Sequence, residues 1–144
     1  MKKLLTYIFL SLLLVACSQE DKTPEGALKT FVEARFEKVV SREFIAERVA
    51  GKMKESFDSL TDEDFLKFSD LRNVKKNSFK VLSKSCHDNK CFLTYLVSFN
   101  TNNQFNSEVK KIAEMVQVGE KWLIEDVSNL KTYHEANEPI NPLE

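Results

Sequence analysis

Two of the three cysteines in this 144-residue chain, Cys86 and Cys91, are separated by only four residues, and one of these is His87. Two thiols and an imidazole at this spacing allow a disulfide, a redox centre or part of a zinc site. A redox centre favours two intervening residues, and a zinc site needs a fourth ligand. In an oxidising compartment a structural disulfide is the expected chemistry, and a metal site is the weaker alternative.

The third cysteine, Cys17, follows a segment with the pattern of an export signal. Two lysines precede an apolar run of about twelve residues, Leu4–Val15, which is shorter than the roughly twenty residues that span a bilayer. The small Ala16 comes next, and residues 14–17, Leu-Val-Ala-Cys, resemble the lipobox of bacterial lipoproteins. We therefore expect removal of residues 1–16 as a signal peptide, with an ordinary secretory signal and a chance cysteine as the alternative.

The lipobox resemblance implies acyl chains such as palmitate on the Cys17 sulfur and a membrane-anchored protein outside the cytosol. One chain gives reversible binding, whereas two or three make attachment stable. Ser18, in place of an aspartate after the lipidated cysteine, favours the periplasmic face of the outer membrane in a Gram-negative source. Cys86 and Cys91 are then the remaining pair, and a disulfide closing so short a ring contributes about 2 kcal/mol.

Composition predicts one packed domain after the signal. The chain has eleven Phe, three Gly and three Pro, and its formal net charge of −1 comes from interspersed acidic and basic residues. This pattern argues against a disordered stalk and shows no nucleic-acid footprint. The expected organisation is a lipidated tether at 17–22, a single α+β domain at 23–131 and a polar C-terminal tail at 132–144.

Capping residues and helical spacing predict three helices in the first half of the domain. A threonine before a proline begins a helix over about residues 24–40. Ser41 caps a second, shorter helix, which Gly51 ends. A hydroxyl-x-x-acid capping box at residues 61–64 begins a third helix over about 62–72.

Alternating apolar residues predict an antiparallel sheet in the second half. Residues 87–90 are expected to form a hairpin tip, because Asp and Asn favour turns. Helices followed by antiparallel strands indicate an α+β arrangement, with the helices on one face of the sheet. The expected strands contain residues 79–81, 93–99, 107–118 and 122–127.

Three segments, residues 23–31, 61–65 and 116–124, together resemble small lipoproteins with the nuclear transport factor 2-like (cystatin-like) fold. The resemblance implies three helices packed on a curved four-stranded antiparallel sheet, forming a cone whose mouth holds an apolar ligand or is covered by a partner. Arg35, in the apolar stripe of the first helix, is expected to pair with a carboxylate or to lie at the rim. The residues expected to form the core or line the cone are Phe31, Arg35, Phe65, Tyr95, Trp122 and Ile124.

The chain offers few groups for catalysis. Enzymes with this fold generally use a His, or an acid and a Tyr, inside the cone, where proton transfer is protected from water. His87 is expected on the hairpin tip and His134 on the tail, both solvated, whereas Asp126 and Tyr95 are the acid and phenol that could face inward. We predict no catalytic residue, metal or cofactor and therefore no enzyme.

Three functional hypotheses follow. The first is a non-catalytic anchored domain that binds a partner protein or an envelope component. The second is a carrier or sensor of a small apolar ligand held in the cone, motivated by the many Phe residues. The third is a hydrolase or isomerase that would use Asp126 or Tyr95 in an open cavity. The bilayer is the expected contact of the Cys17 acyl chains, and sheets of this fold often pair back to back, which makes a homodimer possible.

Overall fold

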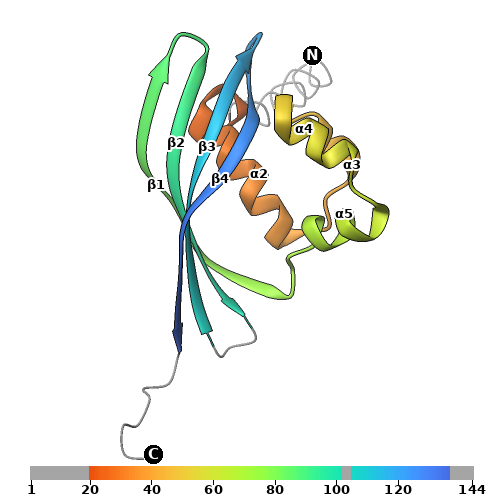
Figure 1. Cartoon of the computed structure of the whole chain (residues 1–144), viewed down its shortest axis with the longest axis vertical. Coiled ribbons are helices and arrows are strands. Elements are labelled where there is room, and N and C mark those ends of the chain that lie inside the picture. The colour runs from red at the N-terminus through yellow and green to blue at the C-terminus, as the bar shows by residue number, and fades with distance from the viewer. Residues whose placement is uncertain (1–19, 102–104, 137–144) are drawn as a thin grey trace, which may run out of the picture.

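The computed structural model describes residues 20–101 and 105–136, in which helices precede a four-stranded sheet (Figure 1). Cys17 and the expected signal peptide lie outside the described residues. The helical segments are a 3₁₀ turn η1 (Glu20–Lys22), then α2 (Pro24–Glu37), α3 (Arg42–Ala46), α4 (Gly51–Asp58) and α5 (Asp62–Ser69). The strands are β1 (Val74–His87), β2 (Lys90–Thr101), β3 (Phe105–Val118) and β4 (Lys121–Ala136).

Side-chain caps begin three of the helices. The Thr23 hydroxyl accepts a hydrogen bond from the Gly26 amide at 3.1 Å, and a proline follows at the first position of α2. Ser41 accepts from the Phe44 amide at 3.1 Å and begins α3, and Thr61 accepts from the Asp64 amide at 3.2 Å and begins α5. These predicted helix starts are confirmed.

The prediction that Gly51 ends a helix is wrong, because α3 ends at Ala46 and Gly51 begins α4. The backbone of residues 48–50 bonds to β4: the Ala50 amide donates to the Ile124 carbonyl, and the Ile124 amide donates to the Arg48 carbonyl, both at 2.9 Å. From there the chain turns into a new helix through a Gly51 φ of +48°. The described residues therefore form four α-helices and the 3₁₀ turn η1, where three helices were predicted.

The sheet is antiparallel, with its strands in chain order β1-β2-β3-β4. Asp88, at a φ of +52°, and Asn89 form the hairpin tip between β1 and β2, and Gly119, at +63°, turns β3 into β4. Register shifts in the β1–β2 and β3–β4 pairs bend the long strands, as Figure 1 shows. The four predicted strands are confirmed, although β4 continues past the expected domain end at residue 131 to Ala136, which pairs with Phe105.

The core lies between the helices and one face of the sheet (Figure 1). Alternate residues of β2 and β3 point toward α2 and are fully buried, as Leu93 and Met115 are. No helix of the described residues is long and apolar enough to cross a membrane. The most deeply buried apolar side chains are Leu28, Val32, Ile45, Cys91, Leu93, Ala113, Met115 and Ile124.

Candidate functional site

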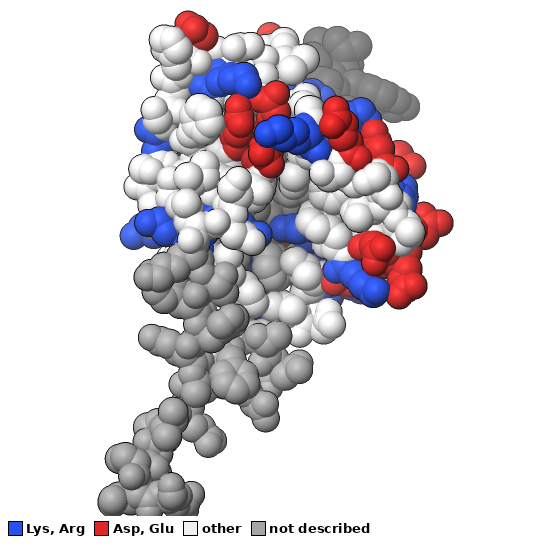
Figure 2. Space-filling view, in the orientation of Figure 1, with Lys and Arg blue, Asp and Glu red and all other residues white. Residues whose placement is uncertain are grey.

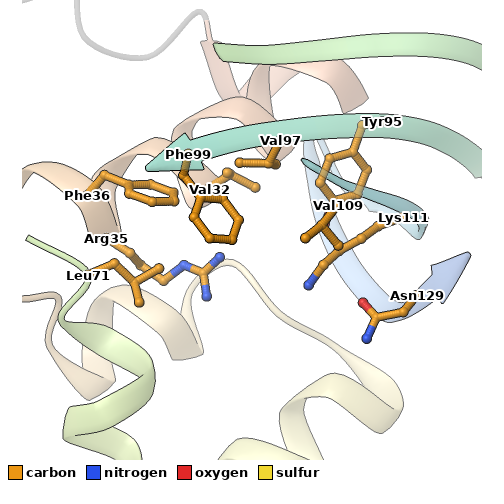
Figure 3. Close-up of a pocket in the computed structure, with 10 residues that line it drawn as sticks. All are labelled: Val32, Arg35, Phe36, Leu71, Tyr95, Val97, Phe99, Val109, Lys111 and Asn129. Carbon is orange, nitrogen blue, oxygen red and sulfur yellow. The ribbon is translucent and has the colours of Figure 1, made fainter. Parts of the chain in front are cut away.

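A cavity of about 290 Å³ lies between helix α2 and the sheet face that α2 covers (Figure 3). Helix α2 contributes residues at positions i, i+3 and i+4, which share one helix face. Strands β2 and β3 contribute alternate residues, which point to one face of the sheet. We call this cavity the α2 pocket, and it is lined by Val32, Arg35, Phe36, Leu71, Tyr95, Val97, Phe99, Val109, Lys111 and Asn129.

Strand register brings the polar lining residues of the sheet into one row. Tyr95 of β2 pairs with Lys111 of β3, and Lys111 pairs with Asn129 of β4, so all three point to the helix side. The neighbouring row joins Val97 to Val109 and supplies an apolar wall. Arg35 faces this row from α2 (Figure 3).

Arg35 is held by aromatic rings and has no ion-pair partner within the described ranges. Its guanidinium carbon lies 4.3 Å from the centre of the Phe68 ring and 5.3 Å from that of Phe31, which are cation–π distances. Its Nε is buried and has no hydrogen-bond partner among the residues described. Burial lowers the pKa of Arg35 to about 10, an effect that Tyr95 partly opposes, and the side chain keeps its charge at neutral pH.

The pKa values of Tyr95 and Lys111 are also shifted by their position in the pocket. Tyr95 is 3% exposed, and burial raises the pKa of its hydroxyl to about 12, so the group remains a neutral donor. Burial, together with the positive charge of Arg35, lowers the pKa of the Lys111 ammonium. The lining residues include two cations and no carboxylate.

The six predicted lining residues divide between this pocket and the core. Arg35 and Tyr95 line the pocket. Phe31 is buried beside Phe68, with ring centres 6.3 Å apart, and Phe65 is buried beside Phe57 at 6.5 Å. The last two residues lie on β4, where Ile124 is buried and Trp122 packs partly buried against the core.

The side chains considered for catalysis do not lie together in one site. Asp126 is not among the pocket residues, and its carboxylate lies 3.7 Å from the Lys52 ammonium. The His87 side chain is 95% exposed at the hairpin tip. His134, expected on the tail, belongs to β4, where its backbone pairs with Ser107. Within the described ranges, no group of three His, Cys, Asp or Glu side chains is placed to hold a metal ion.

Sequence reasoning missed Lys111 and Asn129. Lys111 lies in phase with Val109 and with the buried Met115, but Ile112 and Val116 are apolar on the opposite phase, so the sequence alone does not show which way Lys111 points. Asn129 is placed by its pairing with Lys111, which the sequence does not show.

Cys86 and Cys91 are joined in a disulfide across the hairpin tip, with Cα atoms 4.1 Å apart. The pair stands at directly opposite register positions of β1 and β2, next to the turn. Beside it the Lys90 ammonium bonds to Glu125 at 2.7 Å and to Glu114 at 3.0 Å, which raises the pKa of Lys90. The expected disulfide is present, and together with this ion-pair cluster it ties the tip to the rest of the sheet.

Charged side chains are mixed over the face drawn in Figure 2, and a hollow separates the sheet side from the helix side, with basic atoms beside it. Two carboxylates of α2 are paired with lysines of β1: Glu33 with Lys76, and Glu25 with Lys84 at 2.8 Å. The positive charge of the pocket is therefore not neutralised by these neighbours.

Comparison with known proteins shows the fold and not the function. No protein-family model matches the chain, and no curated protein matches it. The solution structure of a SEC-C motif containing protein from Rhodopseudomonas palustris is similar, with a TM-score of 0.63 and 13% identity over 82% of this chain and 87% of that one. The predicted nuclear transport factor 2-like fold is therefore wrong: the chain shares the fold of this SEC-C motif containing protein, and the order of helices before the sheet is the part of the prediction that holds.

Proposed function

We propose that this chain is an anchored, non-catalytic binding domain that holds a small ligand in the α2 pocket. The observation that carries the proposal is the buried Arg35 Nε, which has no hydrogen-bond partner in the part of the chain that the structure describes. A buried polar group without a partner costs free energy, and a bound water, ion or ligand is one of the explanations for such a group. A ligand that accepts a hydrogen bond from Arg35 would remove this cost.

The size of the pocket favours a small molecule over a protein partner. A cavity of about 290 Å³ lies at the lower end of the range of small-molecule pockets, which is about 300 to 1,000 Å³. A stable protein interface buries about 800 Å² on each partner, far more than a cavity of this size offers. Of the functional hypotheses drawn from the sequence, the carrier or sensor of a small ligand is therefore the one we retain, with the change that the pocket is cationic as well as apolar.

The protonation states in the pocket favour binding over proton transfer. A general acid or base works best with a pKa near the pH of the reaction. The pKa values of Arg35 and Tyr95, about 10 and about 12, lie far above neutrality. Both side chains thus stay protonated and serve as hydrogen-bond donors.

We further propose that Cys17 anchors the domain to the outside of a membrane, on the periplasmic face of the outer membrane in a Gram-negative source. The support is the lipobox resemblance of residues 14–17. Metabolic labelling with palmitate is expected to mark the wild-type chain and to leave a Cys17→Ser variant unlabelled and absent from the membrane fraction. Equal maturation of both chains without label would contradict the anchor and leave the pocket proposal standing.

Native mass spectrometry of the full-length chain, gently extracted from its own membranes, tests the binding proposal. We expect a fraction of the protein to carry a small molecule that dissociates on activation. The same measurement on an Arg35→Met variant is expected to show mainly unliganded protein. A wild-type chain that always emerges empty, and that gains stability from no member of a library of small metabolites, would contradict the proposal.

A further inference from the structure

Two like charges point into the α2 pocket from opposite walls. Figure 3 shows the Arg35 guanidinium and the Lys111 ammonium directed toward the same space, one from α2 and the other from β3. Burial, and after it the positive charge of Arg35, lowers the pKa of Lys111. Two cations facing one cavity without an anion are unfavourable, and an anion placed between them relieves both the repulsion and the lost hydration.

No lining residue of the α2 pocket is a carboxylate, so the lining does not supply that anion. Four carboxylates on α2, on β4 and after α5 already pair with other cations. The anion must therefore come from outside this set of side chains. The pairs are Glu33 with Lys76, Glu25 with Lys84, Glu125 with Lys90, and Asp70 with Arg72.

The rest of the lining is apolar and partly aromatic. Phe36 and Phe99 present rings to the cavity on the side of Arg35, with Leu71 close to them (Figure 3). Val97 and Val109 complete the wall along the sheet. A ligand that fits this pocket needs one anionic end and an apolar body, because burying further polar groups against these walls would cost free energy.

We propose that the α2 pocket binds a small monocarboxylate, with its carboxylate beside Arg35 and Lys111 and its apolar body against Phe36 and Phe99. The inference rests on the proposed binding function and names its ligand class. A guanidinium fork matches a carboxylate with two parallel hydrogen bonds, and the Tyr95 hydroxyl is a further neutral donor in the same row.

The mostly apolar lining favours a carboxylate over a phosphate ester. A phosphate ester buries more polar oxygens than a carboxylate does, and each needs a hydrogen-bond partner in the pocket. A carboxylate leaves the rest of the ligand free to be apolar and to contact both rings. An acid with a phenyl ring or a short alkyl chain meets this description.

Calorimetric titration of the full-length chain in nonionic detergent tests the assignment with 3-phenylpropanoate and its uncharged analogue 3-phenylpropanol. We expect the acid to bind at least tenfold more tightly than the alcohol. Replacing Arg35 by Met is expected to weaken acid binding by about tenfold to a hundredfold, because losing a hydrogen bond to a charged group lowers affinity by about this factor. Arg35→Lys is expected to restore part of the loss by keeping the charge.

Controls separate the pocket from general charge and from misfolding. Arg72→Met removes an exposed arginine that pairs with Asp70, and the acid is expected to bind this variant as it binds the wild type. Lys111→Met provides a second pocket variant if Arg35→Met fails to unfold cooperatively, and acid binding to it is also expected to weaken.

The outcomes distinguish the two proposals. Equal binding of acid and alcohol, or unchanged acid binding by both pocket variants, would overturn the carboxylate assignment and leave the binding function in place. Absence of acid binding to the wild type would overturn the assignment as well. The binding function itself fails only if native mass spectrometry and the metabolite library also find no ligand.

Discussion

Replacing Arg35 by methionine should stabilise the empty protein while it removes ligand binding. The side chain carries a buried charge that no carboxylate in the described residues neutralises, and methionine has a similar reach with no charge to bury. A gain in stability on losing a buried arginine is unusual, and it is the expected result where a residue is kept for binding at a cost in stability.

The magnitude follows from the pKa of Arg35. A fall from the ordinary arginine value of about 12.5 to about 10 corresponds to a burial cost of about 3 kcal/mol, at about 1.4 kcal/mol for each pH unit. Because a base with a lowered pKa in the folded state is destabilising wherever it is charged, this cost is fully present below about pH 10 and fades as the pH rises from there. The cation–π contacts with Phe31 and Phe68 stabilise the folded state by about 1 to 2 kcal/mol and so offset part of this cost. A methionine sulfur packed on the same rings would keep part of that stabilisation.

The expected net gain for Arg35→Met is therefore about 1 to 2 kcal/mol. For a domain of this size it raises Tm by about 4 to 8 °C. Thermal unfolding followed by circular dichroism at pH 7, on full-length chains in the same detergent, measures it. Arg72→Met, which removes an exposed arginine and its pair with Asp70, is the matched control and should lower stability by no more than about 1 kcal/mol. A fall in Tm of several degrees for Arg35→Met would refute the reasoning, because Arg35 would then be stabilised by a partner.

Three further changes test structural features outside the pocket lining: the disulfide, the turn at Gly51 and the Asp70–Arg72 pair. Reducing the hairpin-tip disulfide should lower the free energy of unfolding by about 2 kcal/mol in a urea titration, and an unchanged midpoint would contradict its structural role. Gly51→Ala should destabilise by at least about 1 kcal/mol, because Gly51 has a φ of +48° and a Cβ there would lie 2.8 Å from the Glu125 Cγ; a neutral urea midpoint would count against this turn. Side-chain hydrogen bonds from Arg72 lower the pKa of Asp70 to about 2, so the pair should support the fold above about pH 4 and lose that contribution as the pH falls toward 2. An NMR titration of Arg72→Met should find this pKa close to the ordinary 3.8, and an unchanged value would show another cause.

Local signals made most of the elements predictable. The hydroxyl caps Thr23, Ser41 and Thr61 begin helices because each satisfies an amide within its own first turn, which needs no tertiary information. The alternation of apolar residues fixed the strands in the same way. The Cys86–Cys91 bridge followed from a short spacing around turn-forming residues.

Tertiary contacts decided what could not be predicted. Gly51 begins a helix only because Ala50 is bonded to Ile124 of β4, about seventy positions further along the chain. The fold family was misassigned because the segments at 23–31, 61–65 and 116–124 are capping and turn patterns, which many unrelated folds share.

The site was predicted only in part, because strand register places two of its residues. Arg35 and Tyr95 stand out from sequence as polar groups in apolar stripes, one on a helix and the other on a strand. Lys111 is followed by polar and apolar residues without a clear single phase, and its inward direction depends on its register with Tyr95. Asn129 enters the site only through the register of β4 on β3.

Amide NMR of the uniformly labelled full-length chain, titrated with 3-phenylpropanoate, tests the central claim that the α2 pocket is a ligand site most directly. We expect saturable shift changes concentrated on α2 around Arg35 and on the facing residues Tyr95, Val97 and Lys111, and absent from the hairpin tip near Cys86. Shift changes spread evenly over the surface, or confined to residues outside this pocket, would contradict it.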